Sequence, residues 1–132
     1  MNPRLHIREI REDEFGALGQ LMVEVYSGLE GFPTPAEQPK YYEMLANIGR
    51  FTEKKSAKVL VAVLNGRELA GGVVYFSDMA QYGSGGSATT LLNTSGIRLL
   101  GVRAKHRGAG AGRALTNACL KLAREKDRKS VV

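Results

Sequence analysis

The sequence has 132 residues, of which 43% are hydrophobic and 24% are charged, a composition that indicates one folded domain and excludes a disordered chain or a long coiled coil. Its single cysteine, Cys119, excludes an intrachain disulfide and a cysteine-rich zinc site. The net charge of +6 is concentrated after residue 97, where ten Lys and Arg residues stand against two acidic ones, and this asymmetry predicts an anionic partner such as nucleic acid, a membrane surface or a phosphorylated cofactor.

No segment approaches the roughly 20 consecutive apolar residues that span a bilayer. The first fifteen residues also lack an apolar stretch of the signal-peptide type. We therefore expect a cytoplasmic protein that does not associate with membranes, and a reducing compartment suits a chain with one cysteine.

The N-terminal part of the chain predicts one strand and two helices. Residues 5–10 alternate in polarity as a short strand does. Asp13 is expected to cap a helix whose apolar residues recur at helical spacing through Val25. The segment from Thr34 to Glu37 has the form of a capping box, but Pro39 lacks an amide that a helix starting there would use. The second helix therefore starts either directly after Thr34 or at Pro39.

The clearest local pattern is a β-hairpin. Residues 58–64 are apolar on both faces, and Asn65-Gly66 is the preferred dipeptide of a tight turn. Residues 68–76 form the returning strand, in which Gly71-Gly72 indicates a bulge or a close approach of two backbones. Since both faces are apolar, we expect a sheet that is covered on both sides.

The C-terminal part predicts a loop, two strands and a helix. Residues 80–96 are rich in Gly, Ser and Thr and are expected to form a loop, either a lid beside a site or a simple connection. Residues 97–102 form a strand, a glycine-rich turn follows, and residues 114–126 form a helix. Cys119 falls on the apolar face of that helix, so we expect a core residue and not a nucleophile. Residues 130–132 begin a further strand. The element order is β-α-α-β-β-β-α-β, an α/β domain of the mixed α+β type.

The segment that carries chemistry is residues 99–115, in which a strand runs into a loop of alternating glycines and a helix follows directly. Unpaired amides in such a turn and the positive end of the helix dipole form an anion site suited to a pyrophosphate. Arg107 and Arg113 can add positive charge. Two nucleotide-binding patterns do not fit, because the dinucleotide fingerprint requires glycine at position 113 and the Walker pattern requires Lys there.

The pattern that fits is R-x-x-G-x-G, which begins at Arg107 and follows a strand of the form Leu-Gly-Val. Here the sequence resembles the GNAT superfamily of N-acetyltransferases, in which this motif binds acetyl-CoA. The order of the other elements matches over essentially the whole chain. The resemblance implies the GNAT acyl-CoA N-acyltransferase fold, with a mostly antiparallel central sheet flanked by helices, as one domain over residues 1–132.

The resemblance also implies roles for individual residues. Leu100, Gly101 and Val102 are expected to hydrogen-bond the pantetheine arm through their backbone groups, as an added strand would. The amide of Val102 is expected to polarise the thioester carbonyl. The amides of the motif loop are expected to hold the pyrophosphate: Arg107, Gly108, Ala109, Gly110, Ala111, Gly112 and Arg113. The basic residues after position 97 would complement this cofactor, which accounts for the charge asymmetry without nucleic acid.

The implied reaction is direct transfer of an acetyl group from acetyl-CoA to a primary amine, without a metal. The amine must lose a proton and the departing thiolate must gain one. Family members often place a carboxylate early in the strand before the motif, but this chain has Ser95-Gly96-Ile97-Arg98 there, so no catalytic residue is assigned. Residues near the first two helices either line an acceptor site or have surface and packing roles: Glu30, Glu37, Tyr26, Tyr41 and Tyr42.

Three further expectations remain open. Family members continue past the motif helix to a helix that carries a tyrosine acid, so we expect either a polypeptide that runs on past Val132 or a homodimer whose second copy supplies the missing sheet edge. A non-catalytic CoA-binding or sensor domain and a basic nucleic-acid-binding module are the alternative functions. Against nucleic acid, no aromatic residue follows Tyr82, so base stacking has no platform beside the basic residues.

Overall fold

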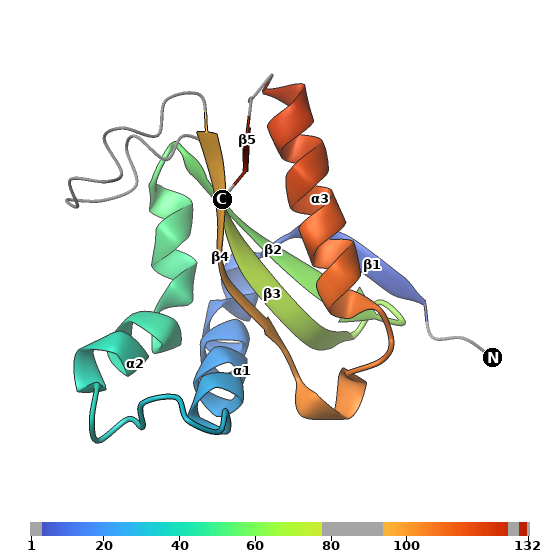
Figure 1. The fold of residues 1–132 in the computed structure, drawn as a ribbon. Helices are drawn as coiled ribbons and strands as arrows, with labels where there is room; N and C mark the ends of the chain where they lie inside the picture. Colours follow the sequence, from blue (N-terminus) through green and yellow to red (C-terminus); the bar gives the residue numbers. More distant parts are fainter. Residues whose placement is uncertain (1–3, 78–93, 127–129, 132) are drawn as a thin grey trace.

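The structure is a computed structural model that describes residues 4–77, 94–126 and 130–131. A central sheet separates two helices on one face from a third helix on the other (Figure 1). The main elements in chain order are β1 (Leu5–Glu9), α1 (Phe15–Ser27), α2 (Pro39–Ala46), β2 (Ala57–Leu64), β3 (Glu68–Phe76), β4 (Thr94–Val102), α3 (Ala111–Glu125) and β5 (Ser130–Val131). Short 3-10 turns lie at Glu12–Glu14, Ile48–Glu53 and Ala104–His106.

Within the described residues, the sheet has five strands in the order β1-β2-β3-β4-β5. The first four pair antiparallel, whereas the two described residues of β5 run parallel to β4 and pair with Thr94 and Ser95. The expected element order and the mostly antiparallel sheet between helices are therefore confirmed. The expectation of a domain that spans residues 1–132 and continues past Val132 stays a prediction.

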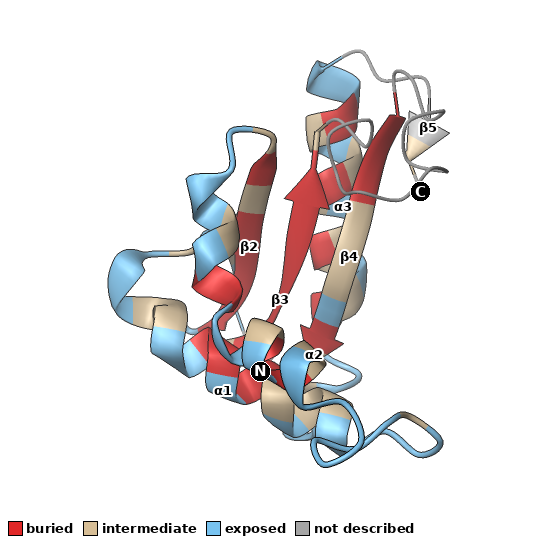
Figure 2. Ribbon diagram, turned by 90° about the vertical axis from the view of Figure 1, so that its left-hand side faces the viewer, coloured by how far each residue is buried: buried red, intermediate tan, exposed pale blue. Residues whose placement is uncertain are grey.

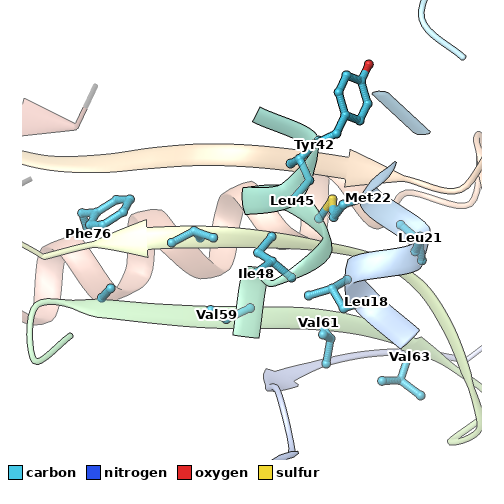
Figure 3. Close-up of a cluster of buried hydrophobic side chains, with 12 residues drawn as sticks. Leu18, Leu21, Met22, Tyr42, Leu45, Ile48, Val59, Val61, Val63 and Phe76 are labelled. Carbon is cyan, nitrogen blue, oxygen red and sulfur yellow. The ribbon is translucent and has the colours of Figure 1, made fainter. Parts of the chain in front are cut away.

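Strand β2 contributes to a separate core on each face of the sheet. Its odd-numbered residues from Val59 to Val63 lie beneath α1 and α2, beside Leu18 (Figure 3). Its even-numbered residues from Leu60 onwards pack toward α3, beside Leu115. Strands β2 and β3 are consequently buried over most of their length (Figure 2). Each large aliphatic side chain buried in this way stabilises the fold by about 1.5–3 kcal/mol. Because a core lies on each face, the prediction of a sheet covered on both sides is confirmed.

The hairpin between β2 and β3 turns at the predicted dipeptide. Asn65 has φ 53° and Gly66 has φ 74°, and the amide of Arg67 donates to the carbonyl of Leu64 at 3.0 Å. Asn65 also accepts a hydrogen bond through Oδ1 from the Arg4 amide at 3.1 Å. Asparagine and glycine tolerate this left-handed backbone better than other residues. The position of the turn could therefore be predicted from this dipeptide.

The second helix starts at Pro39, the later of the two expected positions. The reciprocal hydrogen bonds of a capping box do form, from the Thr34 amide to Glu37 Oε1 at 3.0 Å and from the Glu37 amide to Thr34 Oγ1 at 3.3 Å. However, a proline disfavours helical geometry in the residue before it. Gln38 accordingly has φ −135° and ψ 65°, so the box closes a turn and no helix follows from it.

The corner between β1 and α1 is fixed by Glu14 and not, as expected, by Asp13. Helix α1 begins at Phe15 without a side-chain cap, because Asp13 lies in the preceding 3-10 turn. The Glu14 carboxylate accepts hydrogen bonds from Arg8 Nη1 at 2.8 Å and Nη2 at 2.7 Å, and from the Arg11 amide at 2.9 Å. This bidentate pair joins the first strand to the turn that leads into the first helix.

Glu14→Gln should lower the free energy of unfolding by about 1 kcal/mol at neutral pH, because an amide cannot replace the bidentate pair. The hydrogen bond from Arg8 lowers the pKa of Glu14 from its ordinary value of 4.5. The carboxylate therefore contributes stability above pH 4.5 and loses it as the pH falls through the lowered pKa. Urea titrations should show the difference between wild type and variant disappear in that range. Glu12→Gln is the control, and an equal loss in both variants would contradict this role.

Strands β3 and β4 come unusually close where both carry glycine. A Cβ added at Gly71 would lie 2.4 Å from the carbonyl oxygen of Gly101. The pairing then skips Val73 on β3 and both Leu99 and Leu100 on β4, so one residue faces two and β4 bulges. The close approach predicted at Gly71-Gly72 is confirmed. On its other side, β3 also has a register shift in its pairing with β2, next to Gly71.

Gly71→Ala should destabilise the protein by about 2 kcal/mol or more, because the added methyl group meets backbone that cannot rotate away. Gly16→Ala is the matched control, since this exposed glycine of α1 has no atom within 4 Å of the added Cβ. The control should be neutral or should stabilise the helix by up to about 1 kcal/mol. Thermal and urea unfolding measure both, and an unchanged stability of Gly71→Ala would refute the close approach.

Candidate functional site

The turn from β4 into α3 has a backbone that favours glycine. Gly108 has φ 90° and Gly110 has φ 88°, a region that L side chains avoid. Gly110 is the N-cap of α3, so the helix begins at Ala111 and not at Ala114 as expected. The difference arises because Gly112, which the sequence reading placed in the loop, lies in the first helical turn. Among the described residues no side chain caps this end, and the amides of a first turn have no partner within the helix.

The turn surrounds a hollow of about 490 Å³. Its walls come from the end of β4, the 3-10 turn, the glycine loop and the start of α3. The lining residues are Val102, His106, Arg107, Gly108, Gly110, Ala111, Gly112 and Arg113. The sequence reading missed His106, although it lies directly before the motif. Ala109 is exposed in the same loop but does not line the hollow.

Two amides of the loop are used within the loop itself. The Arg107 amide donates to the carbonyl of Ala104 at 3.2 Å, and the Ala109 amide donates to the carbonyl of His106 at 3.3 Å. Fewer amides are therefore free to donate to an anion than the whole set of residues 107–113 that was expected. They are the amides of Gly108 and Gly110 and those of the first turn of α3.

Positive charge surrounds the hollow, and part of it is neutralised by the fold. Lys105 Nζ lies 2.7 Å from Glu68 Oε1 on β3, and His106 Nε2 lies 3.3 Å from the same oxygen. The Lys105 ammonium, and after it the nearby His106 ring, lowers the pKa of Glu68. Arg107 and Arg113 are exposed on the rim, and neither forms an ion pair with another described residue. These two arginines are the cations that can face an anion in the hollow.

The end of β4 that precedes the turn presents one open edge. Its residues from Ile97 onward have no β5 partner in the described part of the chain. Leu99 has φ 56°, and Leu100 is 38% exposed. Gly101 is buried against α1, where an added Cβ would lie 2.7 Å from Met22 Sδ. The backbone expected to bind a pantetheine arm therefore begins within the bulge, at Leu100, and leads into the anion hollow.

Aromatic side chains gather where α1, α2 and the segment between them meet. The rings of Tyr26, Phe32 and Tyr41 have centroids between 5.3 and 6.2 Å apart. Tyr42 is buried in the core beneath α2, and its hydroxyl donates to the Pro33 carbonyl at 2.6 Å. Packing is therefore the role of Tyr42, whereas the other three rings form a partly exposed cluster.

The candidate carboxylates of this segment show no sign of acting as a base. Glu37 Oε1 accepts hydrogen bonds from the amide and the hydroxyl of Thr34, both at 3.0 Å. These bonds lower the pKa of Glu37, whereas a general base at neutral pH needs a raised one. Glu30 is exposed. Glu37 therefore closes a turn, and neither residue is assigned a catalytic role.

A buried hydroxyl group occupies the part of β4 where the family resemblance implies a carboxylate. Ser95 is fully buried, its Oγ lies 2.7 Å from Tyr75 Oη, and it donates to the Ser77 carbonyl at 3.2 Å. These bonds hold Ser95 within the sheet, where β4 begins at Thr94, so the prediction that the loop extends to residue 96 is wrong. The rest of that loop, residues 80–93, lies outside the described residues.

Other kinds of site find no support in the described residues. Cys119 is fully buried, and burial raises the pKa of its thiol to about 12, so the prediction of a core residue is confirmed. Among the residues that the structure describes, no group of three or more His, Cys, Asp or Glu is placed to hold a metal ion. None of the helices described is long and apolar enough to cross a membrane.

With this geometry established, comparison with family models matches residues 18–132 to the acetyltransferase (GNAT) family. The match covers most of the chain, and the protein therefore belongs to the GNAT acetyltransferases, a family that uses acetyl-CoA. The resemblance inferred from the motif is confirmed. A search of curated protein sequences finds no significant match.

Solved structures share the fold at low sequence identity. A GNAT-family acetyltransferase from Staphylococcus aureus Mu50 aligns with a TM-score of 0.71 at 14% identity, over 97% of this chain and 71% of that one. A GCN5-related N-acetyltransferase from Kribbella flavida gives 0.69 at 18%, over 96% and 69%. A GNAT-family acetyltransferase from Brucella melitensis, solved in complex with acetyl-CoA, gives 0.68 at 17%, over 97% and 73%. The expected GNAT fold is thereby confirmed, and this chain is shorter than each of these proteins.

Gly110→Asp should reduce acetyl-CoA binding by more than about tenfold, because it places a negative side chain where the amides would hold a phosphate. Gly110→Asn is the matched control, since it brings nearly the same shape and the same positive φ without the charge. Both variants should remain folded with a loss of about 1–2 kcal/mol. Calorimetric titration measures the affinities. Unchanged affinity of Gly110→Asp would show that the cofactor binds elsewhere.

Proposed function

We propose that this protein is an N-acetyltransferase that transfers an acetyl group from acetyl-CoA to a primary amine. The observation that carries the proposal is the hollow between β4 and α3, in which a bulged strand, a left-handed glycine turn and an uncapped helix start meet. Membership of the GNAT family supports the same ligand.

The residues of the hollow suit the diphosphate of CoA. A Cβ built at Gly108 or Gly110 would meet no atom within 4 Å, so the space above the turn is open and a side chain would fill it. The free amides supply directional donors, and the dipole of α3 favours negative charge at this end. Arg107 and Arg113 on the rim add charge without taking the place of the amides.

The edge of β4 would hold the pantetheine arm through backbone groups of Leu100, Gly101 and Val102. We assign the amide of Val102 to polarise the thioester carbonyl, where charge develops as an amine attacks. When bound, acetyl-CoA supplies an acetyl thioester, whose C–S bond breaks as the amine forms the new amide bond. No general base or acid is assigned among the described residues.

A CoA-binding domain without catalysis is the second candidate for the same site. It is favoured by Ser95, which is buried and hydrogen-bonded to Tyr75 and Ser77 where the resemblance implies a carboxylate. A nucleic-acid-binding module is less well supported, because Glu68 already neutralises part of the basic region. Turnover and binding measurements separate these functions.

Acetyl-CoA at about 100 times its Kd should raise the free energy of unfolding by about 3 kcal/mol. Calorimetric titration with CoA and acetyl-CoA should show binding, and a panel of amines should show acetylation with one or more acceptors. Binding without acetylation of any amine would select the non-catalytic domain. An absence of heat with both ligands would refute the proposal, and salt-dependent DNA binding in that case would point to nucleic acid.

A further inference from the structure

Helix α1 is attached to strand β4 at the bulge itself. The hydroxyl of Tyr26, in the last turn of α1, donates a hydrogen bond to the carbonyl of Leu100 at 3.0 Å. One residue further along β4, Gly101 lies so close to the helix that a Cβ would be 2.7 Å from Met22 Sδ and 3.6 Å from Val25. Strand and helix are therefore joined here by a directed polar bond as well as by apolar contact.

The bulge needs such a support, because its backbone is unfavourable. Leu99 has φ 56°, a left-handed conformation that costs a branched side chain more than it costs glycine. The pairing with β3 passes over Leu99 and Leu100, so the ladder does not fix the Leu100 carbonyl. The bond from Tyr26 fixes that carbonyl, and with it the plane of the peptide that continues into Gly101.

The surroundings of Tyr26 keep its ring in place and its hydroxyl protonated, so that it can donate this hydrogen bond. Its side chain is half-buried, and its ring packs against Phe32 and Tyr41 with centroids 5.3 and 6.2 Å away. Burial, with the neighbouring Tyr41, raises the pKa of its hydroxyl to about 12. The hydroxyl consequently keeps its proton at physiological pH, and the ring has little freedom to turn away from the strand.

We propose that Tyr26 is a positioning residue for acetyl-CoA: its hydroxyl holds the Leu100–Gly101 peptide so that the open edge of β4 is aligned for the pantetheine arm. This inference rests on the proposed function, since it concerns the same strand edge. Tyr26 itself need not touch the ligand. Its hydroxyl acts through the backbone of Leu100, by removing conformations of the edge that cannot bind.

The test compares Tyr26→Phe with Tyr42→Phe in the full 132-residue chain. Each variant removes one hydroxyl that donates to a backbone carbonyl, Leu100 in the first case and Pro33 in the second, but only the first carbonyl belongs to β4. Calorimetric titration with acetyl-CoA should show affinity weakened by about three- to tenfold in Tyr26→Phe, the size expected for one hydrogen bond. Tyr42→Phe should keep the wild-type affinity even if it loses as much thermal stability.

A second measurement examines the ligand-free protein. Hydrogen exchange at the Gly101 amide, which shares its peptide group with the Leu100 carbonyl, should be faster in Tyr26→Phe than in wild type or Tyr42→Phe. Equal affinity of Tyr26→Phe and wild type would overturn the proposal, and so would an equal loss in both variants, which would indicate a general effect of stability. Failure of the proposed function can be distinguished from failure of the positioning role, because the wild type itself would then give no heat with acetyl-CoA. That result would overturn both proposals.

Discussion

The contact between the backbones of β3 and β4 at Gly71 and Gly101 is the constraint on which the site depends. A Cβ at Gly71 would clash with the carbonyl of Gly101, and a Cβ at Gly101 would clash with Met22 of α1. The absence of side chains at both positions lets the helix and the two strands meet. Directly beside this contact, the extra residue of β4 is accommodated by the bulge at Leu99 and Leu100. The chain then leaves the sheet toward the glycine turn.

The two cores hold the parts of the site in fixed positions. Helices α1 and α2 cover one face of the sheet and α3 covers the other (Figure 1). Helix α3 is anchored along one side by Leu115, Cys119 and Ala123, all of them buried. Its N-terminus therefore has a defined place beside the end of β4. A binding site built from helix and strand ends in this way is held more precisely than one built on a free loop.

Charge in the C-terminal third serves more than one purpose. The excess of Lys and Arg after residue 97 predicted an anionic partner, and the hollow with Arg107 and Arg113 agrees with that expectation. Lys105, by contrast, is paired with Glu68 of the hairpin. This pair ties the 3-10 turn to the sheet and leaves the arginines on the rim. A count of charges along the chain overestimates the charge that can face a ligand, because it cannot show which cations are already paired.

The sequence by itself determined the element order, the hairpin turn, the two-faced sheet and the glycine motif, because each depends on neighbours along the chain. Apolar alternation, Asn65-Gly66 and the motif from Arg107 are local patterns with local physical causes. The tertiary structure alone decided that Glu14 and not Asp13 fixes the first corner, that Ser95 belongs to the sheet, and that Tyr26 reaches Leu100. These features depend on side chains that meet only after folding, and Tyr26 and Leu100 are 74 positions apart. No local pattern encodes such a contact, since its partner is chosen by how a helix packs on a sheet.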